Sequence, residues 1–204
     1  MSFSFAQVEA ALALCHDIAP DKRSAFANRL KHLQKLGFLP DIRTGRGKAA
    51  DYKGHHVFLL GLALQFIELG LTPERTIFVI RENLNFVLIP TRFAMRSLTT
   101  ETKPLPYFVR FDPSILDSLR YDNPLHDDAS ETTFYGGIGT IADTIEDMGT
   151  QWPRLSLINM TSLVSQTFSS FHEVDPTLAD TFEAELTAWL DTYPDHPKET
   201  EFDR

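Results

Sequence analysis

The sequence predicts a mainly α-helical fold with a small β component, the α+β class. Apolar residues recur at helical spacing in several segments, as Phe26, Leu30 and Leu33 do. A run of aromatic and β-branched residues near the middle of the chain predicts short strands. Of the 204 residues, 43% are hydrophobic and 23% charged, a composition typical of a globular chain with a sizeable core.

The first two helices are predicted over residues 5–14 and 21–36. Alanines favour the first helix, and Pro20 is expected to close it. Asp21 is expected to cap the second helix, and Gly37 supplies the usual stop.

The second helix has a polar face opposite its apolar stripe. Turning the helix by 100° per residue gathers on that face the following residues: Ser24, Asn28, Lys31 and Lys35, with His32 at the flank. No acidic residue follows Asp21 in this helix. These side chains are hydrogen-bond donors or cations long enough to reach base edges and phosphates.

A polar stretch over residues 41–51 follows Phe38-Leu39-Pro40. Gly45 and Gly47 permit a tight turn that would project Arg46 and Lys48. Such a hairpin could grip a phosphate backbone or a narrow minor groove, and a plain surface loop explains the same residues equally well. Tyr52 is expected to end the second arm of the hairpin, with its ring covering the turn.

Two further helices are predicted over residues 54–69 and from 73 to about 84. The first is apolar almost all round and is therefore expected to be nearly buried, with Gly70 after its end. Thr72 and Pro73 form a helix-start signature, the cap and the first helical position.

The remainder predicts a β-ribbon followed by two amphipathic helices. Residues 85–95 and 105–111 are rich in β-branched and aromatic residues, and Pro90 is expected to stop the first run. Apolar stripes over residues 157–171 and 178–189 predict the helices. The glycines of segment 136–139 are interpreted as a flexible turn.

Three parts of the chain follow from this pattern. Residues 1–84 form a head, residues 85–193 an α+β body with a dimerisation or effector role, and residues 194–204 a mobile tail.

Charge separates the head from the body. The chain carries 19 Lys and Arg against 28 Asp and Glu, a net charge of −9. Residues 1–110 contain 15 basic and 9 acidic residues, a net +6, whereas residues 111–204 contain 4 and 19, a net −15. Nine basic residues lie between Lys22 and Lys53. This asymmetry indicates a head that binds a polyanion, although a solvated basic face would look the same.

The order of these motifs resembles the winged helix-turn-helix domain of the MerR family of transcriptional regulators. Leu30-Lys31-His32-Leu33-Gln34-Lys35-Leu36-Gly37-Phe38-Leu39-Pro40 matches the end of the family's recognition helix in register. Residues 43–52 resemble the family's wing, and Leu69-Gly70-Leu71-Thr72-Pro73-Glu74 resembles the link in its next helix pair. The resemblance covers residues 8–84 and implies that Lys31 and His32 occupy DNA-contacting positions.

The chain also departs from the family pattern. The link of residues 16–20 is longer than a tight helix-turn-helix turn, and Leu33 replaces a tyrosine. Family members continue into one long dimerisation helix, where this chain has a β-prone run, so a dimer is expected to assemble differently. No cysteine follows Cys15, so metal sensing is not supported.

The resulting expectation is a sequence-specific regulator of transcription that binds double-stranded DNA. The expected DNA-binding residues are Arg23, Ser24, Asn28, Lys31, His32, Lys35, Arg43, Arg46, Lys48 and Lys53. We expect a homodimer in the cytoplasm, associated with the nucleoid, with a protein of the transcription machinery as a possible further partner and no membrane partner. The alternatives are a phage-type excisionase or other architectural DNA-binding protein, and a protein-interaction adaptor that binds no DNA.

No enzyme, cofactor or metal site is expected. Leu125-His126-Asp127-Asp128 has the residue types of a metal-assisted hydrolase, but a polar loop is the better interpretation. Cys15, the only cysteine, cannot form an intramolecular disulfide, which indicates a reducing compartment, and it is expected in the core and not as a nucleophile.

Overall fold

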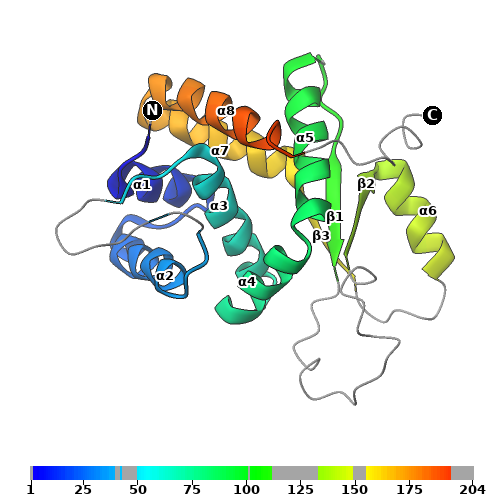
Figure 1. Cartoon of the computed structure of the whole chain (residues 1–204), viewed down its shortest axis with the longest axis horizontal. Coiled ribbons are helices and arrows are strands. Elements are labelled where there is room, and N and C mark those ends of the chain that lie inside the picture. Colours follow the sequence, from blue (N-terminus) through cyan, green and yellow to red (C-terminus); the bar gives the residue numbers. More distant parts are fainter. Residues whose placement is uncertain are drawn as a thin grey trace.

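The computed structural model of the chain is mostly helical, with one small antiparallel sheet (Figure 1). The structure describes residues 2–39, 42, 50–100, 102–111, 133–148 and 155–193. The α+β class is therefore confirmed. The predicted tail, residues 194–204, and the segment 125–128 lie outside the described residues.

The first two helices form where the sequence predicts them. Helix α1 spans Phe5–Cys15, begins at a Ser4 capping box and is followed by a 3₁₀ turn, Pro20–Lys22, that leads into α2, Arg23–Lys35. The predicted Asp21 cap is wrong. Asp21 lies inside the 3₁₀ turn, where its carboxylate pairs with Lys22 at 3.0 Å, and the residue before α2 makes no side-chain cap.

Helix α3, Gly54–Glu68, is buried around most of its circumference, as its apolar composition predicts. The Thr72 hydroxyl caps α4, Pro73–Glu82, by accepting a hydrogen bond from the Arg75 backbone N–H at 3.3 Å. Gly37 and Gly70 follow α2 and α3 with φ of 70° and 98°, the left-handed backbone that lets a glycine end a helix.

The strand predicted over residues 85–95 is wrong, because this segment belongs to helix α5, Leu84–Thr100, with Pro90 inside it. An interior proline costs a helix roughly 3 kcal/mol. The apolar face that carries Val87, Ala94 and Met95 is buried, and α5 packs against α7 and the sheet. Burial of this helical face overrides the β propensity of the local residues.

The sheet has the strand order β2-β1-β3, with antiparallel pairing throughout. Its central strand, β1 at Tyr107–Phe111, confirms the strand predicted over residues 105–111. The partners are β2, Thr133–Gly137, and β3, Ser156–Asn159, neither of which the sequence predicts. The predicted turn over residues 136–139 is wrong, because β2 ends at Gly137 and helix α6, Ile138–Met148, follows at once. Figure 1 shows the sheet between α5 and α6.

The last two helices confirm the predicted amphipathic pair. Helix α7 spans Met160–Val174 and α8 spans Pro176–Leu190, and the two pack against each other (Figure 1). Helix α7 also packs on α1, and α8 packs on α3, so one apolar cluster contains side chains from both sides of residue 84. Because the core is shared in this way, a test of either half requires the full chain.

Among the described segments, none of the helices combines the length and the apolar character needed to cross a bilayer.

Candidate nucleic-acid interface

Helix α2 presents a polar face to solvent on the side of the molecule away from the sheet and α6 (Figure 1). Its apolar residues Phe26, Leu30 and Leu33 are 5% exposed or less, which fixes the rotation of the helix about its axis. The opposite face therefore points outward. Its exposed polar residues include Ser24, Asn28, Lys31, His32 and Lys35. The structure thus brings these five predicted site residues together on one surface.

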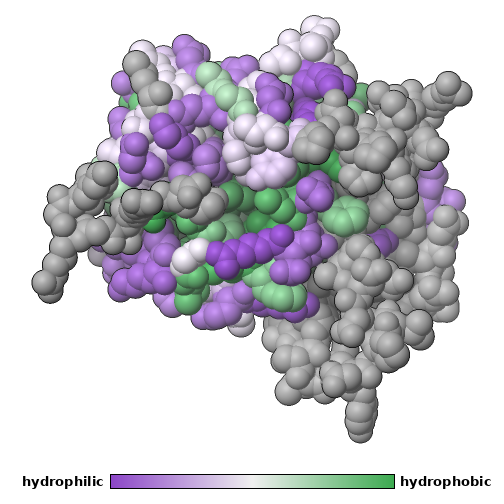
Figure 2. All heavy atoms as spheres, viewed as in Figure 1, coloured by the Kyte–Doolittle hydropathy of each residue, from purple (hydrophilic) through white to green (hydrophobic). Residues whose placement is uncertain are grey.

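The electrostatic character of α2 is positive. The helix contains no aspartate or glutamate, and Arg29, also exposed, adds a cation that the sequence-predicted site left out. Arg29 was missed because its angle on the helix places it near the apolar edge, and only the structure shows that it reaches solvent. Figure 2 shows hydrophilic residues over the lower left of the molecule, where Figure 1 places α2.

Two residues on the exposed face have partners within the chain. The Lys31 ammonium lies 5.2 Å from the centroid of the Phe5 ring, at the start of α1. Such a cation–π contact at an exposed site contributes about 0.5–1 kcal/mol, so it orients the lysine without sequestering it. His32 Nε2 lies 4.0 Å from Glu74 Oε1 on α4, and both side chains remain more than half exposed.

Arg23 has a different environment from the other predicted residues of α2. Its Nε donates to Glu9 Oε1 at 2.6 Å and its Nη2 donates to Glu9 Oε2 at 2.9 Å, a two-point ion pair between α2 and α1. The hydrogen bonds to Glu9 raise the pKa of Arg23 above its ordinary value. Because a planar guanidinium matches a carboxylate in this geometry, the pair fixes the angle between the two helices.

Lys53 lies at the junction between α3 and α8. Its ammonium is 3.7 Å from Glu185 Oε1, and the Gly54 backbone N–H donates to Glu185 Oε2 at 2.7 Å. A carboxylate at a helix N-terminus is stabilised by the unpaired N–H groups there. The structure therefore pairs Lys53 with the acidic second half of the chain.

The predicted wing residues Arg43, Arg46 and Lys48 lie outside the described residues. On either side of this segment, Leu39 is buried just beyond α2, and the Tyr52 hydroxyl accepts a hydrogen bond from the Gln34 amide in α2. The Tyr52 backbone pairs with Phe3, and its ring is 1% exposed. The two flanking residues, Leu39 and Tyr52, thus both lie beside the C-terminal half of α2.

Cys15 is shielded by its surroundings. Its Sγ lies 3.7 Å from Thr167 Oγ1 on α7, and burial raises the pKa of the thiol above its ordinary value. Because the thiolate is the reactive form, a raised pKa leaves little of it at neutral pH.

We expect Cys15 in the native chain to react with Ellman's reagent at pH 7.5 at least about tenfold more slowly than in the urea-unfolded chain. The rate should increase as the pH rises toward the elevated pKa. Equal rates in the folded and unfolded chains would contradict the partial burial of the thiol and its raised pKa.

Comparison with family models, with curated proteins and with solved structures finds no match for this chain.

Proposed function

We propose that this chain binds double-stranded DNA in a sequence-specific manner and regulates transcription, with α2 in the major groove. One observation carries the proposal: the outward face of α2 is exposed, basic and free of acidic residues. A lysine there can bind the O6 and N7 acceptors of guanine, and an asparagine can make two hydrogen bonds to adenine. We therefore assign base reading to Asn28, Lys31 and Lys35, with Ser24 and His32 beside them.

The arrangement around α2 supports a winged helix-turn-helix as the finer description of the head. Helix α1 packs against α2 and is joined to it by the pair of Arg23 with Glu9. The residues that flank the segment resembling a wing, Leu39 and Tyr52, both lie beside α2, and Arg46 and Lys48 stand between them in the sequence. In this proposal Arg23 and Lys53 position the helices, while Arg43, Arg46 and Lys48 bind phosphates.

Two further elements belong to the proposal: a homodimer, and a role for the acidic second half that the charge distribution indicates. A homodimer would place two copies of α2 on half-sites one helical turn apart, about 34–36 Å along the duplex. The acidic second half would limit binding to random DNA, because negative charge repels a polyanion.

The test is the salt dependence of binding, measured by fluorescence anisotropy with the full chain and a labelled duplex selected from genomic fragments. If six phosphates are neutralised, the logarithm of affinity should fall against the logarithm of salt concentration with a slope of about −5. Lys103, exposed in the segment between α5 and β1, provides the control, and Lys103→Ala should leave the slope unchanged.

The same experiment separates the alternatives. A protein-interaction adaptor would show no affinity for duplex at about 50 mM salt, which overturns the proposal. An architectural protein would bind and also bend its site, so a gel mobility assay with the site at varied positions distinguishes it from a regulator.

A further inference from the structure

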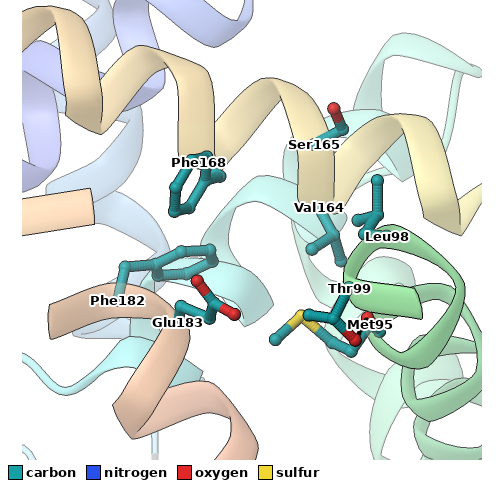
Figure 3. Close-up of a pocket in the computed structure, with 8 residues that line it drawn as sticks. All are labelled: Met95, Leu98, Thr99, Val164, Ser165, Phe168, Phe182 and Glu183. Carbon is teal, nitrogen blue, oxygen red and sulfur yellow. Dashed lines mark hydrogen bonds between the residues drawn. The ribbon is translucent and has the colours of Figure 1, made fainter. Parts of the chain in front are cut away.

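An apolar cavity lies among α5, α7 and α8, and none of its lining residues belongs to α2 (Figure 3). Its volume is about 180 Å³. Besides two hydroxyl residues, Thr99 and Ser165, its lining consists of six side chains: Met95, Leu98, Val164, Phe168, Phe182 and Glu183. Five of these side chains are apolar, and the sixth is a carboxylate.

The Glu183 carboxylate points into this cavity, toward the space bounded by Phe168, Val164 and Met95 (Figure 3). No described residue forms an ion pair or a hydrogen bond with it. Glu185, two positions along α8, is by contrast held by Lys53 and by the backbone N–H of Gly54. Glu183 therefore lies beside the apolar cavity without a cationic partner among the described residues.

The two phenylalanines add a second preference for positive charge. Phe168 on α7 and Phe182 on α8 line the cavity together, and the face of an aromatic ring attracts a cation. Apolar walls, two rings and one carboxylate complement an amphipathic molecule with an apolar body and one cationic end. An anionic ligand would meet repulsion from Glu183.

The volume limits the size of that molecule. A cavity of about 150 Å³ holds benzene, so about 180 Å³ accommodates an aromatic ring with a short side chain. We propose that this cavity binds a small amphipathic monocation of the arylalkylamine or alkylammonium class, with its charged nitrogen at Glu183. This site lies outside the proposed DNA interface and does not depend on it.

The experiment compares three probes that share a phenylethyl body and differ in charge: 2-phenylethylammonium, 2-phenylethanol and 3-phenylpropanoate. Binding to the full chain is measured by isothermal titration calorimetry and by ligand-observed NMR, without DNA. For probes of this size we expect a Kd on the order of 1 mM for the ammonium. The alcohol should bind about tenfold more weakly, and the carboxylate should show no binding.

Two variants test the assigned contact. Glu183→Gln should lower the affinity for the ammonium probe about tenfold, because its charged partner is lost. The affinity for the alcohol should change by less than about twofold. Asp180→Asn removes the same charge one turn earlier on α8, at an exposed position outside the cavity lining. It should leave the affinity for both probes unchanged. Val164→Phe, which fills the cavity, should abolish binding of both probes.

Equal affinity for the ammonium and the alcohol, or an ammonium affinity that Glu183→Gln leaves unchanged, would overturn the assignment of Glu183. Absence of binding by all three probes at about 10 mM, tenfold above the expected Kd, would overturn the cavity as a ligand site. None of these readouts involves DNA, so a failure here is distinguishable from a failure of the proposed function.

Discussion

Gly54→Ala is expected to lower the free energy of unfolding by about 2–3 kcal/mol. A Cβ at this position would lie 2.9 Å from the Leu186 backbone nitrogen and 2.9 Å from the Phe182 carbonyl oxygen. These atoms belong to the backbone of α8 and cannot rotate away, so α3 and α8 would have to separate. Urea unfolding followed by circular dichroism measures the change.

Gly61→Ala in the same helix provides the matched control. Its Cβ would meet the ends of flexible side chains, Leu12 Cδ2 at 3.4 Å and Leu163 Cδ1 at 3.6 Å. Replacing an interior helical glycine by alanine adds up to about 1 kcal/mol of helix propensity. We therefore expect the free energy of unfolding of this variant to rise by between zero and about 1 kcal/mol. If both variants unfolded at the same urea concentration, the close approach of α3 and α8 at Gly54 would be disproved.

The sequence could not predict this contact, although it predicted the helix that makes it. Gly54 starts a recognisable apolar helix, but its neighbours on α8 lie about 130 positions further along the chain. Periodicity and capping signals describe at most a few turns of helix at a time. They therefore predicted α1, α2, α3, α4, α7 and α8, and gave no information on how α8 meets α3.

The segment around Pro90 shows where local signals mislead. Its β-branched and aromatic residues predict a strand, and the proline predicts a stop, yet the chain forms helix α5. Val87 and Met95 are buried, and the helix that carries them packs against α7 and β1, which only the folded chain brings together. Strands β2 and β3 were missed for the same reason, because each is four or five residues long and gains its stability from pairing with β1.

The same limit applies to the candidate interface: local sequence signals predict which residues are exposed, but not which partners they have. Exposure of Asn28, Lys31 and Lys35 followed from the helical period, since the buried stripe determines which residues point outward. The partners of Arg23 and Lys53 did not follow, because Glu9 and Glu185 come from other helices. Charge counts alone treat a paired and an exposed cation alike.

The triple replacement Asn28→Ala, Lys31→Ala and Lys35→Ala is expected to reduce affinity for the selected duplex at least about 100-fold. A base contact contributes roughly 1–3 kcal/mol, and three adjacent contacts add incompletely. Alanine favours helices, which offsets the lost contact of Lys31 with the Phe5 ring, so the free energy of unfolding should change by less than about 1 kcal/mol. Anisotropy with the selected duplex and with a scrambled duplex measures both specific and non-specific affinity.

A charge-matched control separates base reading from the loss of positive charge. Arg96→Ala with Lys103→Ala removes two exposed cations at and beyond the end of α5, and should change neither affinity by more than about twofold. If α2 reads bases, Asn28→Ala alone lowers affinity for the selected duplex and leaves the scrambled duplex unaffected, since a neutral amide contributes nothing to counterion release. If the affinity of the triple variant instead falls by the same factor for both duplexes, α2 lies along the phosphate backbone. The base-reading role assigned to α2 would then be wrong.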